Sequence, residues 1–228
     1  MLVVRGLRAS YGASPVLHDV DLDIGAGEVV ALMGRNGMGK TTTIRALMGL
    51  LKPSAGSLVF RGRELSGLAP FQIAGAGIGL VPEGRQIFPR LSVEENLVAT
   101  ARPGRWDLAS VYSLFPALKA RRSHGGTRIS GGEQQMLAIG RALMTNPELL
   151  VLDEATEGLA PLLRADIWHC LASLKQHGQA ILVVDKHVGA LARIADRFTI
   201  MEKGVTVWTG GREAFVSDPA IAQRYLGV

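Results

Sequence analysis

The chain begins with alternating polar and apolar residues and then changes to short runs that are wholly apolar. From Val16 to Ile24, one face has the alternating residues Val16, His18, Val20, Leu22 and Ile24, and Leu17 and three aspartates lie largely on the other face. This period of two predicts a half-exposed antiparallel strand. Residues 1–7 would pair with it, giving a small antiparallel sheet.

Later apolar runs have the length of strands buried on both faces, as in a parallel sheet. They cover residues 29–33, 78–81, 149–152 and 180–184, and a shorter strand is expected at 57–61. Between and after them, helical spacing predicts helices at residues 42–51, 71–74, 162–177 and 188–195. Two strands, 197–201 and 205–209, would flank a Lys203-Gly204 turn before two short terminal helices. The fold class is therefore α/β.

Residues 91–145 have a different, wholly helical pattern. Ser92 and Glu95 form the signature of a capping box, with Ser at the cap and Glu three residues later. Further helices are predicted at 107–115 and 132–144, separated by a loop at 121–129. The chain is thus predicted to be one domain over residues 1–228. Its core comprises residues 1–83 and 147–228, and residues 84–146 form an inserted helical subdomain.

Composition narrows the class of protein. Apolar residues make up 47% of the chain and the mean hydropathy is +0.21, which indicates a globular protein. No apolar run approaches the roughly 20 residues of a membrane span, and the first residues lack the layout of a signal peptide. Cys170 is the single cysteine, which excludes an intrachain disulfide and fits a cytosolic protein. The net charge of +5 comes from scattered residues, so we favour an ordinary solvated surface over a surface near anionic lipid, and the latter over nucleic-acid binding.

The segment from Gly34 to Thr41 has the spacing GxxxxGK[ST] between a predicted strand and a predicted helix. Glycines let the backbone curl so that successive N–H groups point at one phosphate chain, and the helix N-terminus adds its dipole. Lys40 would reach the β- and γ-phosphates, and the Thr41 hydroxyl would coordinate Mg²⁺. The predicted nucleotide-binding residues here are Gly34, Arg35, Asn36, Gly37, Met38, Gly39, Lys40, Thr41 and Thr42.

Two acids follow the apolar run at residues 149–152. Asp153 and Glu154 would lie at the carboxyl edge of the parallel sheet, where ligands bind in this architecture. Asp153 suits the Mg²⁺ shell beside Thr41. Glu154 is the candidate to polarise an attacking water.

A second anion site is predicted where the loop at 121–129 meets a helix. Ser130 would cap this helix, and Gly131 and Gly132 leave backbone N–H groups uncovered. The phosphate loop and this segment are predicted in separate subdomains, so one chain cannot easily bring both to one γ-phosphate. Two chains arranged head to tail could enclose one ATP between them.

These three motifs, in this order and spacing, resemble the ATP-binding subunits of ABC transporters over essentially the whole chain. Residues 81–85 (VPEGR), 87–91 (IFPRL) and 157–161 (EGLAP) resemble the branched-chain amino-acid importers of that family, with urea and amide importers close by. The resemblance implies a P-loop NTPase (RecA-like) core, an antiparallel β subdomain and an inserted α-helical subdomain.

The resemblance also implies roles for single residues. Tyr11 matches the aromatic residue that stacks on adenine, and Val16 and Glu133 join the nucleotide-binding set. Glu83 stands where most of the family has a glutamine that contacts Mg²⁺, and an acid there can still bind the metal or its water. Residues 157–161 correspond to the loop that crosses to the partner subunit.

The family has a histidine, the switch histidine, just past the strand that corresponds to residues 181–184, and this sequence does not clearly match it. Lys186 occupies that position, and His187 lies one residue further. Either side chain can bind phosphate, so three alternatives stay open: Lys186 replaces the histidine, the strand end is shifted and His187 serves, or His187 is a surface residue at a helix start.

The sequence therefore predicts an ATPase that uses ATP and Mg²⁺ and forms a dimer with a second ATPase subunit, identical or not. It would be cytoplasmic and peripheral on the inner face of the plasma membrane, with two transmembrane permease subunits and, indirectly, a solute-binding protein as partners. Alternatives are a nucleotide-dependent clamp with little turnover, a urea or amide importer subunit, and a soluble ABC protein that acts on nucleic acid or ribosomes. A P-loop kinase fits poorly because it would leave Ser130, Gly131 and Gly132 without a role.

Overall fold

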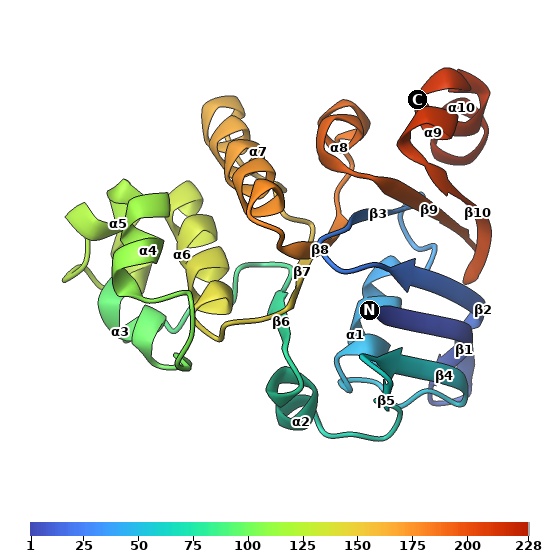
Figure 1. Cartoon of the computed structure of the whole chain (residues 1–228), viewed down its shortest axis with the longest axis horizontal. Helices are drawn as coiled ribbons and strands as arrows, with labels where there is room; N and C mark the ends of the chain where they lie inside the picture. Colours follow the sequence, from blue (N-terminus) through green and yellow to red (C-terminus); the bar gives the residue numbers. More distant parts are fainter. Residues whose placement is uncertain (228) are drawn as a thin grey trace.

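The computed structural model describes residues 1–227, which form one ten-stranded mixed sheet with helices on both faces (Figure 1). The strands are β1 (Leu2–Tyr11), β2 (Ser14–Ile24), β3 (Val29–Met33), β4 (Ala55–Phe60), β5 (Arg63–Glu64), β6 (Ile78–Val81), β7 (Leu149–Asp153), β8 (Ala180–Val184), β9 (Arg197–Glu202) and β10 (Val205–Gly211). The helices are α1 (Lys40–Leu47), α2 (Pro70–Gly75), α3 (Val93–Val98), α4 (Leu108–Leu114), α5 (Pro116–Ala120), the 3₁₀ turn η1 (Gly126–Arg128), α6 (Gly131–Leu143), α7 (Pro161–Gln176), α8 (Val188–Ile194), α9 (Arg212–Ser217) and α10 (Pro219–Leu226). None of the helices in residues 1–227 has the length and apolar character needed to span a bilayer.

The core of the sheet is parallel, in the order β9-β3-β8-β7-β6. Its strands are buried on both faces, which explains their continuous apolar sequences. In β7, Leu149 and Val151 face the core that contains α1, and Leu150 and Leu152 face the core that contains α6 and α7. The predicted α/β class and its parallel sheet are confirmed.

The antiparallel part differs from the prediction in two ways. It is not a separate sheet, because β10 pairs with β9 and also contacts β2 at Val205 and Asp19, so all strands form one curled sheet. The alternation within β2 also shifts phase, because its pairing with β1 slips between Leu17 and Val20. As a result Leu17 is buried, whereas His18 is exposed.

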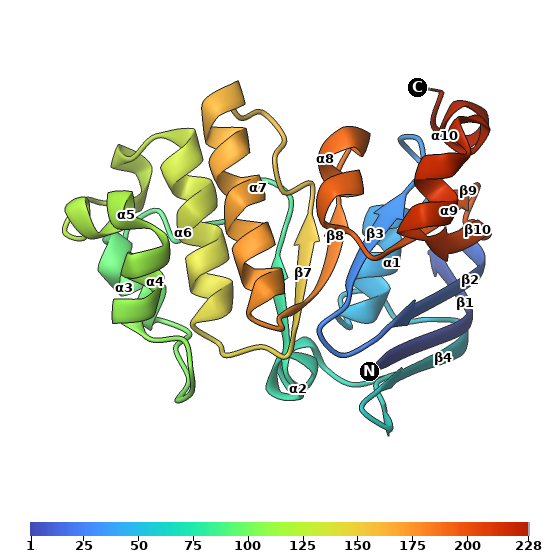
Figure 2. The ribbon, with the colours of Figure 1, turned by 45° about the horizontal axis from the view of Figure 1, so that its top comes forward.

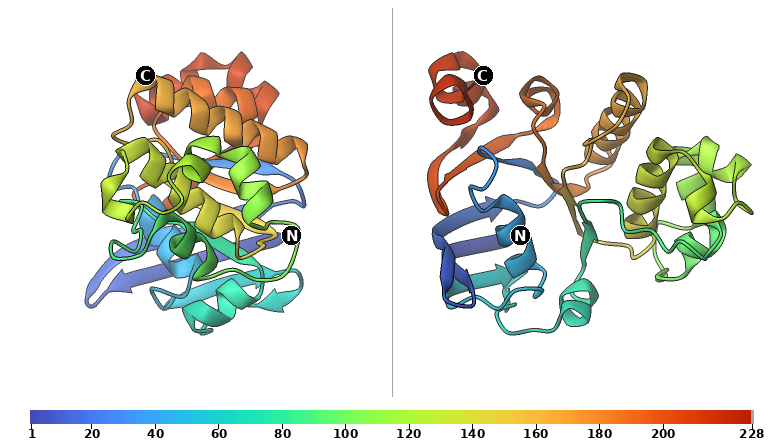
Figure 3. Two further views of the ribbon diagram at one scale, coloured as in Figure 1. Left: turned by 90° about the vertical axis from the view of Figure 1, so that its left-hand side faces the viewer. Right: turned by 180° about the vertical axis from the view of Figure 1, so that it is seen from behind.

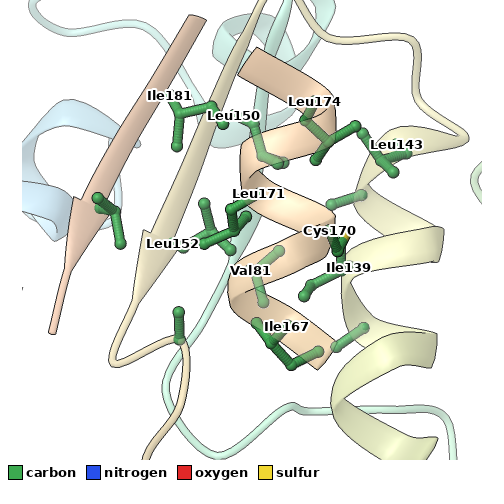
Figure 4. Packing of buried hydrophobic residues seen from close by; sticks show 14 of the residues in the cluster. Val81, Ile139, Leu143, Leu150, Leu152, Ile167, Cys170, Leu171, Leu174 and Ile181 are labelled. Atoms are coloured by element: carbon green, nitrogen blue, oxygen red, sulfur yellow. The ribbon is translucent and has the colours of Figure 1, made fainter. Parts of the chain in front are cut away.

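Helix α7 fills the space between the sheet and the inserted helices. Its buried residues Ile167, Leu171 and Leu174 pack among side chains of β7 and β8, and Cys170 lies toward α6 (Figure 4). In Figure 2, α6 and α7 lie next to each other, and β7 is seen between α7 and α8. Cys170 is part of this core, with 5% of the residue exposed.

The inserted helices α3 to α6 and the antiparallel strands lie at opposite ends of the molecule, with β6, β7 and β8 between them (Figure 3). The capping box of Ser92 and Glu95 is confirmed. The prediction missed α5, which begins at Pro116 immediately after α4; proline at the first position of a helix loses no hydrogen bond. The domain limits at residues 83/84 and 146/147 stay a prediction.

The first helix also differs from its predicted range of 42–51. It begins at Lys40, because Gly39 adopts a left-handed φ of 102° as its cap. It ends at Leu47, where Gly49 (φ 69°) turns the chain and the Leu50 and Leu51 N–H groups donate to the Arg45 carbonyl. The phosphate loop therefore passes directly into the helix at its lysine.

Candidate functional site

The loop between β3 and α1 is shaped by glycines that no other residue could replace without strain. Gly34 has φ 144°, and a Cβ there would lie 2.4 Å from the Met201 carbonyl oxygen. Gly39 has φ 102°, and a Cβ would lie 2.8 Å from a methyl group of Leu17. The strands beneath the loop thus fix its course, and its backbone is available to surround an anion.

Lys40 lies at the first position of α1, with its side chain folded over the loop. Its Nζ donates to the carbonyl oxygens of Gly34 (2.8 Å) and Arg35 (3.0 Å). Burial lowers its pKa, and the carboxylates of Glu154 and Asp153 partly oppose that effect. A phosphate chain in the loop would offer the ammonium stronger, charged acceptors.

The structure brings the two motifs of the predicted metal site together. The Thr41 hydroxyl donates to Oδ1 of Asp153 over 3.3 Å, although the residues lie 112 positions apart. Asp153 is 4% exposed at the end of β7. Burial raises its pKa, and the hydrogen bond from Thr41 opposes the increase.

Two adjoining pockets surround the loop. The first is lined by Gly34, Asn36, Lys40, Glu154, Glu157, Val184, Asp185 and Lys186. The second is lined by Tyr11, Val16, Asn36, Gly37, Gly39, Lys40, Thr41, Thr42 and Glu154. The residues that they share, Asn36, Lys40 and Glu154, join them into one site. We call the first the phosphate pocket, because it lies on the side predicted for the phosphates, whereas the second includes the residues predicted to contact adenine.

Tyr11 is the last residue of β1, where it pairs with Ser14. The residue is 42% exposed, and the Arg45 guanidinium lies 5.7 Å from the ring centroid. Together with Val16 it provides an apolar wall next to the phosphate loop. That position is suitable for a base stacked on the ring.

Two predicted loop residues line neither pocket. Arg35 extends toward the C-terminal end, where its Nη2 would lie 2.8 Å from a Cβ on Gly227. The Met38 sulfur accepts from the Lys203 N–H (3.1 Å), and its carbonyl accepts from the Gly204 N–H (3.1 Å). Met38 thus ties the loop to the turn at Lys203 and Gly204, and the Arg35 side chain points away from both pockets.

Glu154 lies at the centre of an acidic group. Carboxylate oxygens of Glu154, Glu83 and Glu157 all lie within 4.8 Å of one another. Hydrogen bonding with Glu157, burial and the neighbouring negative charges raise the pKa of Glu154 to about 7. Its φ of 54° is in the left-handed region, a strained conformation that often marks functional residues. The carboxyl group is therefore held in a position and with a pKa suited to proton transfer near neutral pH.

The structure separates the two candidates for the switch residue. Lys186 lines the phosphate pocket, is 69% exposed in its side chain, and lies 3.7 Å from a Glu157 carboxylate oxygen. His187 does not line it: its Nδ1 contacts Oδ1 of Asp185 (2.6 Å) and the Thr156 hydroxyl (3.2 Å), and its side chain is 24% exposed. The geometry favours Lys186 as the side chain that reaches the phosphates.

Sequence reasoning missed Asp185. It is 7% exposed and lines the phosphate pocket. Its carboxylate accepts from the N–H and hydroxyl of Thr156 (2.9 and 2.6 Å) and from the His187 N–H (3.0 Å). The sequence did contain a signal for Asp185, because it is an acid directly after a fully apolar strand, as Asp153 is.

The predicted second anion site lies apart from both pockets. Ser130 caps α6 as predicted: its hydroxyl accepts from the Glu133 N–H (3.3 Å), and the Glu133 carboxylate accepts from the Ser130 N–H (2.7 Å). Glu133 thus completes the cap. Gly132 allows α6 to approach α7, since a Cβ there would lie 2.4 Å from a Leu163 methyl group. None of these residues lines a pocket with Lys40.

Comparison with known proteins gives a consistent result. Residues 17–157 match the family model described as ABC transporter. The chain is 39% identical to the high-affinity branched-chain amino acid transport ATP-binding protein BraG of Pseudomonas aeruginosa, covering 100% of both chains. It is 33% identical to the lipopolysaccharide export system ATP-binding protein LptB of Haemophilus influenzae, covering 100% of this chain and 97% of that one. Among solved structures, a nucleotide-free ATP-binding cassette from an ABC transporter has a TM-score of 0.84 at 25% identity, with coverage of 98% and 97%.

Proposed function

The chain belongs to the ABC transporter family as an ATP-binding subunit that hydrolyses ATP, and we propose that this hydrolysis drives uptake of branched-chain amino acids. The full-length similarity to BraG supports this cargo, and the similarity to LptB supports lipopolysaccharide export as a second candidate. The observation that supports the chemical role is the 3.3 Å contact of Thr41 with Asp153 beside Lys40 and Glu154.

Nucleotide binding starts from the loop of residues 34–39. The phosphates bind to its backbone N–H groups and to the N-terminus of α1. Lys40 then exchanges its contacts with the Gly34 and Arg35 carbonyls for the β- and γ-phosphate oxygens. Tyr11 and Val16 contact the adenine.

The site offers the oxygen donors that Mg²⁺ prefers. The Thr41 hydroxyl and the Asp153 carboxylate would hold the ion, and the nearby Glu83 carboxylate would bind it directly or through a water. When bound, Mg²⁺ neutralises phosphate charge.

Hydrolysis uses Glu154 as the base. Its carboxylate accepts a proton from the water whose oxygen attacks the γ-phosphorus, and the bond to the ADP oxygen breaks. Lys40 and Lys186 stabilise the negative charge on the transferred phosphoryl group from two sides of the pocket. Asp185 and Thr156 hold the start of α8, and with it Lys186, in place.

The active unit is a dimer of ATPase subunits. Ser130, Gly131 and Gly132 lie outside the pockets around Lys40, so they contact the nucleotide of a second subunit, identical or related, arranged head to tail. Residues 157–161 cross to the partner. A monomer would bind ATP but hydrolyse it poorly.

The permease subunits dock on an apolar groove between the core and the inserted helices. The groove includes Leu50, Phe71 and Phe88, which are 51%, 74% and 40% exposed. Exposed side chains of this size favour a protein partner, and the groove adjoins the loop that carries Glu83. The subunit would thus lie on the cytoplasmic face of the plasma membrane, and a solute-binding protein would deliver the cargo to the permeases.

The test of the hydrolytic role is phosphate release by the chain with its permeases and by Glu154→Gln. We expect turnover to fall by about 100- to 10,000-fold while ATP affinity is kept, because only the proton acceptor is lost. Equal rates would rule out Glu154 as the base, and slow turnover in both would favour the clamp alternative.

The cargo is tested by ATP-dependent uptake of radiolabelled leucine, urea or a short-chain amide into vesicles. Transport of lipopolysaccharide in place of these would support the export role.

A further inference from the structure

Arg85 follows Glu83 by two residues and lies in a loop held in an unusual conformation. Arg85 and Gln86 have φ angles of 65° and 44°, in the left-handed region that side chains rarely adopt. Arg141 of α6 holds this conformation, because its Nη2 donates to the carbonyl oxygens of Gln86 (2.7 Å) and Arg85 (3.5 Å). Such strain persists where the surroundings enforce it, and it fixes the direction of the Arg85 side chain.

The Arg85 guanidinium lies against the N-terminus of α6. A Cβ on Gly131 would be 3.1 Å from its Nη1 and 3.4 Å from both its Cζ and its Nη2. Its Nη1 also approaches Oε1 of Gln134 (3.4 Å), and a Cβ on Gly158 would lie 3.9 Å from its Nη2. One side chain therefore touches the Ser130-Gly131-Gly132 segment and the loop that crosses to the partner.

The charge of Arg85 has no matching acid at this position. Among residues 1–227, no carboxylate lies within 4.0 Å of its guanidinium, and Glu133, the nearest acid on α6, caps Ser130 and approaches Arg121 at 3.8 Å. A cation at a helix N-terminus is unfavourable, because the dipole and the free N–H groups there are positive. The same arrangement becomes favourable when an anion binds between the helix and the guanidinium.

We propose that Arg85 is a catalytic residue that contacts the γ-phosphate of the ATP held by the Lys40 loop of the other subunit, next to the Ser130 segment. This rests on the head-to-tail dimer of the proposed function. A guanidinium presents a planar fork to phosphate oxygens and stays charged throughout the reaction. Arg85 would thus act in trans, while Glu83, two residues earlier, acts on the ATP of its own chain.

The first measurement is ATP-driven dimerisation in a Glu154→Gln background, followed by sedimentation. Adding Arg85→Ala should weaken dimerisation at least tenfold while leaving the ATP affinity of the monomer within about twofold, because the cis site keeps Lys40. Arg85→Lys should restore part of the effect, since it keeps the charge but not the fork. Arg90→Ala, an exposed arginine in the same loop, is the matched control and should change nothing.

The second measurement separates trans action from support of Glu83 in cis. Chains carrying Lys40→Ala are mixed with chains carrying Arg85→Ala, each inactive alone, and phosphate release is measured. Action in trans predicts recovered turnover, since the mixed dimer has one site with Lys40 from one chain and Arg85 from the other. Support in cis predicts none, because the chain with Lys40 would have the altered Glu83 loop.

Ser130→Ala in place of Arg85→Ala tells the two proposals apart. If Ser130→Ala leaves dimerisation intact and its mixture with Lys40→Ala stays inactive, the head-to-tail dimer itself is wrong. The head-to-tail dimer is supported if Ser130→Ala weakens dimerisation and its mixture with Lys40→Ala recovers turnover. If, in that case, Arg85→Ala dimerises normally or its mixture with Lys40→Ala stays inactive, only the role of Arg85 is overturned. Arg85→Gln serves in every arm if Arg85→Ala does not fold.

Discussion

The raised pKa of Glu154 predicts how the stability of the nucleotide-free protein depends on pH. Its pKa is raised from 4.5 to about 7 by Glu157, by burial and by neighbouring acids. The folded protein therefore binds more protons than the unfolded chain between about pH 4.5 and pH 7, so stability falls as the pH rises through that window. The full shift corresponds to about 3 kcal/mol; because water partly screens this group, we expect about 1–2 kcal/mol.

The assay is urea denaturation of the nucleotide-free protein and of Glu154→Gln at pH 5, 6, 7 and 8. The free energy of unfolding of Glu154→Gln should rise relative to the unsubstituted protein by about 1–2 kcal/mol between pH 5 and 8, since the amide cannot ionise. Glu157→Gln removes the largest cause of the shift but leaves burial, Glu83 and Asp153, so in that background the same comparison should change less with pH. A difference between the two proteins that does not change with pH would refute the reasoning.

Three further predictions concern packing, the phosphate pocket and the thiol. Gly132→Ala should destabilise the protein by about 1–3 kcal/mol in urea titrations, because the new methyl group would lie 2.4 Å from Leu163; Leu163→Ala in the same chain should recover part of that loss. Lys186→Ala should reduce phosphate release at least tenfold with little change in unfolding free energy, because its side chain lines the phosphate pocket. His187→Ala should instead destabilise the fold, because it removes contacts to Asp185 and Thr156. The reverse pattern would assign the switch to His187. Burial raises the pKa of Cys170 to about 12, so a thiol reagent at pH 8 should label it only after unfolding, and fast labelling of the native protein would contradict this position.

Much of the site could be predicted from local sequence because its parts are local. The loop around Lys40 needs particular glycines, a strand before it and a helix after it, and each leaves a mark within a few residues. The capping box at Ser92 and the helix cap at Ser130 were also predicted from local sequence, although the pairing of Glu133 with Ser130 was not. Lys186 and His187 could not be distinguished, because adjacent residues at a strand end can point to either side, and only contacts with Asp185 and Glu157 decide which faces the pocket.

The sequence by itself determined the fold class, most of the strands and helices in their order along the chain, and which segments carry phosphate chemistry. Strand and helix periods and glycine spacing are short-range properties, whereas short elements such as α5 were missed. Only the tertiary structure decided what meets across long separations. It brought Thr41 to Asp153, gathered Glu83, Glu154 and Glu157, and joined the antiparallel strands to the core through β10. It also placed Arg85 on Gly131. Such pairings depend on sheet order and helix packing, which no local pattern specifies.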